Sequence, residues 1–376
     1  MLQPETALVE YVQWTPQTQF EGGRWHERDH PPRLAACVLR DAGLPQWFDL
    51  GEVDTVLLAV VAARRALNRP EADPTGPLHL LAAHVLHPLL PALSGAKRLR
   101  IAADGPLLLV PFAALPLPNK PVVAETWTAS YVGSGRELLA GTVRPAPCGP
   151  PLVVANPDFG PPARGNSDRA TDLRNLSVQR LPGTAAEAKV LAALFPEAKV
   201  LTGAAAVERA LTSAKGPRFL HVATHGYFLS LTHWPGLAAV KAPLVRSGLL
   251  LAGFNRHKPG ADDGLLTALE AASLDLQGTQ LAVLSACNTG VGELRTSDGV
   301  QGLRRALAIA GAQTVVMSLW SVDDLATQAL MTEFYTQWKV GANRSEALRM
   351  AQQRVREQEK WRHPFFWAGF VSAGVE

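Results

Sequence analysis

The chain has 376 residues, of which 47% are hydrophobic and 18% are charged, and its formal net charge is +3. This composition excludes a disordered chain, and so small and scattered a positive charge gives no support for direct reading of nucleic acid. A chain of this length is expected to form one large domain or two closely joined domains with a buried core.

Cysteine usage and hydropathy indicate the compartment. The three cysteines, Cys37, Cys148 and Cys287, lie far apart and form no Cys-x-x-Cys pair. They predict neither a disulfide framework nor a zinc ribbon, so a reducing cytoplasm is the expected location. The first residues lack a basic patch followed by an apolar run, and no apolar stretch nears the roughly 18 residues that span a bilayer. We therefore expect neither an export signal nor a membrane partner.

The first predicted region covers residues 1–145. Apolar residues recur with helical periodicity over residues 53–67 and 78–93. Residues 99–103 and 107–112 are predicted to form the two arms of a β-hairpin, because Asp104-Gly105 between them is a turn signal. We therefore expect helices and a hairpin in this region.

A proline- and glycine-rich junction is predicted over residues 146–183. Beyond it strands and helices alternate, so residues 184–376 are expected to form an α/β domain whose first strand is residues 152–156. Thr184 and Glu187 have the spacing of a capping box, which predicts a helix that begins there and ends before Pro196.

Two short apolar runs each end in a reactive side chain: residues 219–226 end in Thr-His-Gly and residues 281–290 end in Ala-Cys-Asn-Thr-Gly. Such runs predict buried strands of a parallel sheet, whose carboxyl ends share one edge. His225 and Cys287 are therefore expected to be neighbours, as a cysteine nucleophile and its general base. The backbone amides of Gly226 and Cys287 are the candidate donors to an oxyanion.

The remaining elements follow the same alternation. Residues 229–266 are rich in turn formers and predict a loop over the site. A strand, a crossover helix and a second strand imply a right-handed parallel unit. The later predicted elements are helices over 299–310, 323–338 and 345–358, and strands over 314–319 and 365–371.

The cysteine and the pair of histidines also have less specific explanations. A lone cysteine after an apolar run is most often a buried structural thiol. His221, four residues before His225, suggests a zinc pair, but His-Glu-x-x-His is absent and strand spacing does not bring both imidazoles to one ion. A hydrogen-bonded core histidine is the better interpretation of His221, and no metal site is expected.

Asp323 and Asp324 follow the strand over residues 314–319 and so reach the same sheet edge as the reactive pair. They are candidates for binding a cationic substrate side chain. Either can instead cap the helix that starts there, because acidic residues are favoured at helix N-termini. One residue can serve each role, and Asp324 is the preferred substrate-binding candidate.

These motifs resemble those of CHAT-domain cysteine peptidases, relatives of caspases and separase. The matching segments run from about residue 100 to the end and are 103–112, 224–226, 284–290, 298–303, 318–324 and 367–370. The resemblance implies an α/β fold of the caspase type, a three-layer sandwich with a mostly parallel sheet, preceded by a degenerate N-terminal α/β companion region. It implies that Cys287 and His225 form a catalytic dyad without a cofactor. Asp324 falls where separase carries acidity for arginine recognition.

The activity implied by the resemblance is that of a cysteine endopeptidase, which forms a thioacyl-enzyme on a protein or peptide substrate and cleaves after a basic residue. Regulation by a tetratricopeptide-repeat or other protein is implied as well, as is a role in bacterial defence or programmed death. The alternative is a catalytically silent scaffold of the same fold that binds partner peptides. A nucleotide-binding enzyme is less consistent, because Gly-x-Gly-x-x-Gly and Gly-x-x-x-x-Gly-Lys-Ser/Thr are absent.

Overall fold

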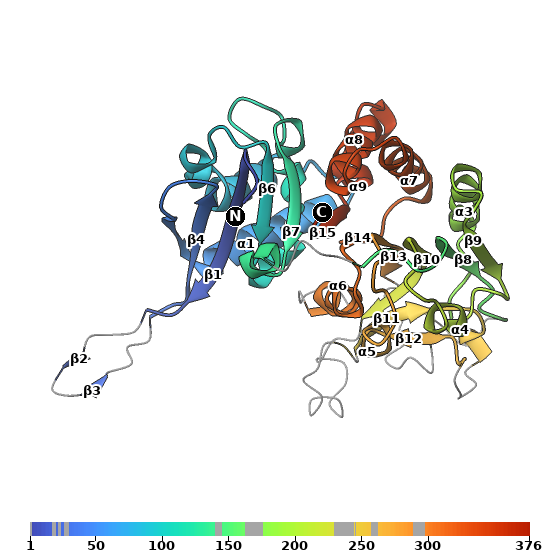
Figure 1. The fold of residues 1–376 in the computed structure, drawn as a ribbon. Coiled ribbons are helices and arrows are strands. Elements are labelled where there is room, and N and C mark those ends of the chain that lie inside the picture. The colour runs from blue at the N-terminus through green and yellow to red at the C-terminus, as the bar shows by residue number, and fades with distance from the viewer. Residues whose placement is uncertain are drawn as a thin grey trace. The chain divides into compact units, whose positions relative to one another are not determined.

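A computed structural model describes residues 2–16, 20–21, 24–25, 30–139, 145–161, 176–228, 244, 246–256, 262–288 and 298–376. At residues 20–21, 24–25, 228, 286–288 and 298–301 it describes the backbone alone. The chain divides into two compact units, Met1–Ala140 and Gly141–Glu376, and Figure 1 shows the elements of each.

The N-terminal unit contains a mixed sheet flanked by helices. Its strands are β1 (Thr6–Trp14), β2 (Phe20–Glu21), β3 (Arg24–Trp25), β4 (Arg33–Arg40), β5 (Gln46–Glu52), β6 (Arg98–Ala102) and β7 (Thr128–Val132). The sheet order is β7-β6-β1-β4-β5, while β2 pairs with β3 alone. β1, β6 and β7 are parallel, and β4 is antiparallel to β1 and β5.

The helices of this unit are α1 (Val53–Leu67) and α2 (Thr75–Val85), with 3-10 turns at η1 (His87–Leu93), η2 (Gly105–Leu109), η3 (Phe112–Ala114), η4 (Val123–Glu125) and η5 (Gly135–Leu139). Helix α1 buries Val56, Val60, Ala63 and Leu67, which recur every three to four residues as an amphipathic helix requires. The helix predicted over 78–93 is divided, because prolines within η1 cannot donate the backbone hydrogen bonds of an α-helix.

The prediction of a hairpin around Asp104-Gly105 is wrong. Its first arm is β6, but its second arm is the 3-10 helix η2, whose first turn contains Pro106. Asp104 caps this helix by accepting a hydrogen bond from the Gly105 amide at 2.8 Å. A proline with a fixed φ and an aspartate cap favour a helical start over a returning strand.

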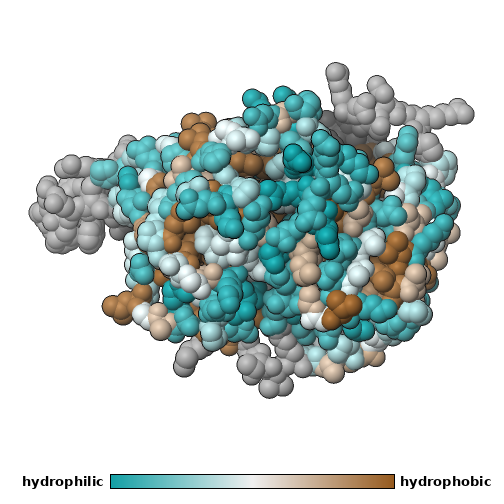
Figure 2. Space-filling view, turned by 90° about the horizontal axis from the view of Figure 1, so that it is seen from above, coloured by the Kyte–Doolittle hydropathy of each residue, from teal (hydrophilic) through white to brown (hydrophobic). Residues whose placement is uncertain are grey.

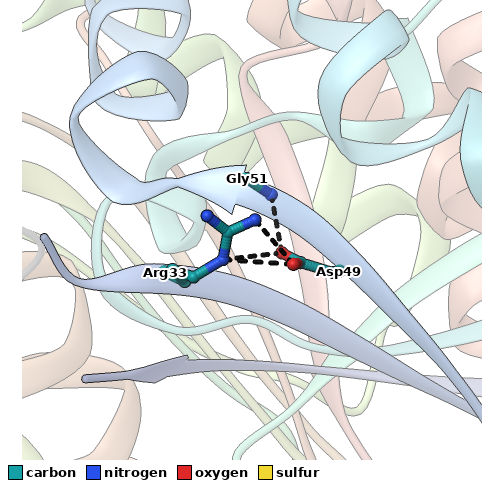
Figure 3. Close-up of polar contacts among 3 residues, drawn as sticks. All are labelled: Arg33, Asp49 and Gly51. Carbon is teal, nitrogen blue, oxygen red and sulfur yellow. Dashed lines mark hydrogen bonds and ion pairs between the residues drawn. The ribbon is translucent and has the colours of Figure 1, made fainter. Parts of the chain in front are cut away.

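An exposed ion pair joins neighbouring strands of this sheet. Figure 3 shows Arg33 of β4 and Asp49 of β5, with 2.6 Å between a guanidinium nitrogen and Oδ2 of the carboxylate. The Gly51 amide also donates to Asp49 at 3.0 Å. The hydrogen bonds from Arg33 and Gly51 hold the pKa of Asp49 below its usual 3.8. Salt screens such an exposed pair, so it fixes local strand geometry more than it stabilises the fold.

The C-terminal unit contains the strands β8 (Leu152–Pro157), β9 (Lys199–Gly203), β10 (Phe219–Phe228), β11 (Ser247–Leu250), β12 (Leu265–Thr267), β13 (Leu281–Asn288), β14 (Thr314–Ser318) and β15 (Phe370–Gly374). Its central strand order is β9-β8-β10-β13-β14-β15. All neighbours in this order are parallel except β14 and β15, which are antiparallel. The β11–β12 pair continues from the carboxyl end of β10.

Helices cover both faces of this sheet. They are α3 (Pro182–Leu194), α4 (Glu208–Thr212), α5 (Ala268–Ala271), α6 (Asp298–Ala310), α7 (Asp324–Lys339), α8 (Arg344–Arg356) and α9 (Pro364–Trp367), with 3-10 turns at η11 (Phe254–Arg256) and η12 (Glu359–Trp361). Figure 1 shows α3, α7 and α8 on one face, and α5 and α6 on the other. The unit is therefore a three-layer α/β sandwich with a mostly parallel sheet, as expected, and an α/β unit precedes it in the chain.

Three expectations for this unit need correction. The segment 229–266 is not only a loop, because it contains β11, η11 and the start of β12, while residues 229–243, 245 and 257–261 lie outside the described residues. The last strand begins at Phe370 rather than at 365, since Pro364 starts the short helix α9. Helix α3 begins at Pro182, so Thr184 lies inside its first turn and no capping box forms.

The molecular surface is mostly hydrophilic on the face drawn in Figure 2, where hydrophobic residues form separate patches. Within the described ranges, no helix combines the length and the apolar character needed to cross a membrane.

Candidate active site

Strands β10 and β13 lie side by side, and their parallel register pairs the Cα of His225 with the Cα of Cys287. Neighbouring strands are about 5 Å apart, so the two backbone positions are adjacent near the carboxyl ends of their strands. Residues 219–224 and 281–285, which precede them, are all buried. Burial on both faces of the sheet explains why these strands are apolar and why their register is fixed.

Two residues that lie between β8 and α3 in the chain, Phe159 and Gln179, contact His225. Its Nε2 lies 2.8 Å from the carbonyl oxygen of Gln179, and its ring packs against Phe159 with 5.4 Å between ring centroids. A carbonyl only accepts hydrogen bonds, so Nε2 carries the proton and Nδ1 of the neutral ring is the basic nitrogen. Burial lowers the pKa of His225 below 6.5, although the Gln179 carbonyl and the negative charge of Asp324 oppose this shift.

Gln179 is a functional candidate that sequence analysis missed. Its segment is held by Asn255, whose side chain accepts from the Val178 amide at 3.0 Å and donates to the Val178 carbonyl at 2.9 Å. This two-bond clamp fixes the backbone one residue before the Gln179 carbonyl. No sequence signal identifies such a contact, because every residue has a backbone carbonyl.

Gly226 and Cys287 were predicted to supply oxyanion donors. Gly226 lies within β10 and pairs with Leu249 of β11 on one side and with Asn288 of β13 on the other. The backbone of Cys287 lies in β13, and the turn after Asn288 falls outside the described residues. The oxyanion role of both amides stays a prediction.

Asp323 and Asp324 are placed differently at the N-terminus of α7. Asp323 is the N-cap, and its Oδ1 accepts from the Ala326 amide at 2.9 Å. Asp324 is exposed, and it lies so close to the start of α3 that a Cβ added to Gly183 would be 3.0 Å from its Oδ2. The charge of Asp324 also acts on the pKa of His225. Asp324 is thus the residue of the two whose carboxylate is available near the imidazole.

His221 lies in the core of the same strand. It has no exposed surface, and its Nδ1 lies 3.0 Å from the hydroxyl of Tyr335 on α7. Burial lowers its pKa to about 3, so the ring is neutral at neutral pH. These contacts are those of a hydrogen-bonded core histidine.

Comparison with known proteins relates the chain to a family. The profile of the CHAT domain matches residues 75–375. Among curated proteins, "Tetratricopeptide repeat protein 28" of Homo sapiens is 36% identical over 118 residues, which are 31% of this chain and 5% of the human protein. The protein of the same name from Mus musculus is 36% identical over 112 residues, or 30% of this chain and 4% of its own length. The chain therefore spans only a small part of these relatives.

Solved structures give more distant similarities. The separase–securin complex of Saccharomyces cerevisiae has a TM-score of 0.40 at 10% identity, covering 90% of this chain and 21% of that one. The Arg-specific cysteine proteinase gingipain R has a TM-score of 0.44 at 10% identity, covering 86% of this chain and 73% of that one. The family itself rests on the sequence profile, which covers well over half of the residues. The chain belongs to the CHAT domain family.

Proposed function

We propose that the chain is a cysteine endopeptidase in which Cys287 is the nucleophile and His225 is the general base. The observation that carries this proposal is the register of β10 and β13, in which His225 and Cys287 are partners. Paired positions on neighbouring strands belong to the same face of a sheet, and this pairing supports the assignment of the two residues to one dyad. The Gln179 carbonyl supports the proposal because it leaves Nδ1 of His225 free to accept a proton.

The proposed reaction follows from these groups. The sulfur of Cys287 attacks the scissile carbonyl carbon while Nδ1 of His225 takes the thiol proton, and backbone amides near Gly226 and Cys287 stabilise the oxyanion. The imidazolium then protonates the leaving amine, and a thioacyl-enzyme remains. Water, deprotonated by His225, attacks the thioester and releases the carboxylic acid and the thiol.

The substrate proposed is a protein or peptide with a basic residue before the cut. Asp324 supports this preference, since its exposed carboxylate lies near His225 and is not used to cap α7. A tetratricopeptide-repeat or other regulatory protein is the partner that we propose, and the reducing cytoplasm is the proposed location because the mechanism requires a free thiol.

The alternative is a scaffold that binds partner peptides without cleaving them. Labelling with an electrophilic peptide ketone that carries Arg separates the two. We expect the label on Cys287 and on no other residue, with loss of labelling in Cys287→Ala and strong reduction in His225→Ala. Cys148→Ala is the matched control, since Cys148 is an exposed free cysteine and its removal is expected to change nothing. Binding of the peptide without labelling or cleavage would establish the scaffold instead.

A further inference from the structure

Below the candidate site lies a buried group of four polar side chains from four different elements. Glu187 of α3 accepts a hydrogen bond from the Ser285 hydroxyl of β13 through Oε2, at 3.1 Å. Its other oxygen, Oε1, lies 3.5 Å from Nε2 of His221 on β10. His221 in turn contacts the hydroxyl of Tyr335 on α7. All four side chains are buried, and Glu187 is only 4% exposed.

Two atoms of this group have no other hydrogen-bond partner. They are Oε1 of Glu187 and Nε2 of His221, which face each other. A buried polar atom without a partner is costly, and one shared proton between these two atoms satisfies both. With that proton in place, Nδ1–H of His221 donates to Tyr335, and the Ser285 hydroxyl donates to Glu187, so the group is fully connected.

The surroundings decide which atom holds the proton. The titratable side chains that face Glu187 from the packed elements are His221 of β10, and Tyr335 and Asp324 of α7. Burial and the negative charge of Asp324 raise the pKa of Glu187 to about 8, although its hydrogen bond with Ser285 lowers it. Burial lowers the pKa of His221 to about 3. At neutral pH the carboxylic acid therefore carries the proton and the group has no net charge.

This group joins the three segments that carry the proposed catalytic atoms. Ser285 lies two residues before Cys287 in β13, and His221 lies four residues before His225 in β10. The helix that carries the acid begins three residues after Gln179. Because the acid bonds to both strands from that helix, it fixes the distance between the Gln179 segment and the two strand ends.

We propose that Glu187 is a positioning residue of this site, one that shares a proton with His221 and ties α3 to strands β10 and β13 behind His225 and Cys287. The inference rests on the proposed peptidase function. It differs from a purely structural role because ionisation of Glu187 places a buried negative charge next to the strand of the nucleophile.

Two variants of Glu187 test this proposal. Glu187→Gln keeps a donor for His221 and an acceptor for Ser285, so we expect kcat at pH 7 within about threefold of the wild type. Glu187→Ala removes both bonds, and we expect kcat to fall by about tenfold to a hundredfold with little change in KM, as misplacement of reacting groups produces. The wild type should also lose activity as the pH rises through about 8, whereas Glu187→Gln should not.

Gln352→Leu is the matched control. Gln352 is a buried side chain of α8 that donates to the Phe370 carbonyl of β15 at 2.9 Å, at the other end of the same sheet. We expect it to lower thermal stability without altering the pH profile. The proposal is overturned if this control shifts the alkaline limb as Glu187→Gln does, if Glu187→Gln is as impaired as Glu187→Ala, or if Glu187→Ala keeps the wild-type kcat.

Alkylation of Cys287 by iodoacetamide, followed from about pH 6 to about pH 10 where thiols titrate, provides a readout that does not depend on peptide cleavage. If the wild type cleaves no peptide, the proposed function fails. The pH dependence of alkylation must still differ between the wild type and Glu187→Gln for the positioning role to stand, and identical profiles would exclude it.

Discussion

The carbonyl oxygen of Gln179 lies 2.8 Å from Nε2 of His225. This contact assigns the ring proton to Nε2 and leaves Nδ1 as the base, so a backbone group determines which nitrogen is available for proton transfer. Burial lowers the pKa of His225 by more than this contact raises it, so the pKa stays below 6.5.

The pH dependence of His225 gives the first prediction. A general base acts in its neutral form, and a lowered pKa keeps the imidazole neutral to lower pH. We therefore expect the acidic limb of kcat/KM for peptide hydrolysis to lie below pH 6.5. His225→Ala should reduce kcat by about a hundredfold to ten-thousandfold. An acidic limb above pH 6.5 would contradict a lowered pKa of His225.

Asn255 is predicted to act on the site through Gln179. Asn255→Ala removes both hydrogen bonds that hold Val178, so the adjacent carbonyl loses its fixed place beside His225. We expect kcat to fall by about tenfold to a hundredfold and the acidic limb to move to lower pH, because the carbonyl that raises the pKa of His225 is displaced. The pH profile of kcat, measured with one fluorogenic peptide for the wild type and the variant, shows both effects. An unchanged acidic limb would show that the clamp does not hold the carbonyl.

Asp324 and Asp323 are predicted to differ although they are neighbours. Asp324→Asn should lower kcat/KM for peptides with Arg before the cut by about tenfold or more, because the substrate guanidinium loses a hydrogen bond to a charged group. Peptides with Ala at that position should be cleaved as before. Asp323→Asn is the control, because asparagine also caps helices and keeps the bond to the Ala326 amide. Equal losses for Arg and Ala peptides in Asp324→Asn would remove it from the substrate pocket.

Two glycines at equivalent helix positions test the contact between α3 and α7. Gly183 and Gly76 are each the second residue of their helix. An alanine Cβ at 183 would lie 2.9 Å from Cβ of Asp324, whereas one at 76 meets nothing within 4 Å. Gly76→Ala should stabilise the chain by up to about 1 kcal/mol, while Gly183→Ala should destabilise it and weaken the preference for Arg. Chemical denaturation measures both, and equal stabilisation would contradict the close approach.

The buried acid predicts the pH dependence of stability. From about pH 4.5 to about 8 the unfolded chain has released the proton of Glu187 that the folded chain retains. The wild type should therefore lose stability relative to Glu187→Gln as the pH rises over this range, with a limiting slope of about 1.4 kcal/mol per pH unit. His221 has the opposite effect from about pH 3 to 6.5, but it is present in both proteins and cancels in the difference. Parallel stability curves would mean that Glu187 is already ionised when folded.

Much of the C-terminal fold follows from local patterns. The apolar runs that predict strands at 219–226 and 281–290 form β10 and β13, and the helix predicted over 299–310 forms most of α6. Patterns fail where one residue changes the local geometry: Pro106 starts a helix in place of a hairpin arm, and Pro182 moves the start of α3 so that Glu187 turns into the core. A side chain expected to cap a helix is instead buried against two strands.

The apolar runs before His225 and Cys287 were enough to predict two buried strands, because a short apolar run bounded by turn-forming residues is typical of a strand covered on both faces. The contact of Gln179 with His225, and the position of Glu187 between His221 and Ser285, are visible only in the folded chain. The first contact uses a backbone carbonyl, which every residue has, and the second depends on how three distant segments pack. Neither leaves a pattern in the order of the residues.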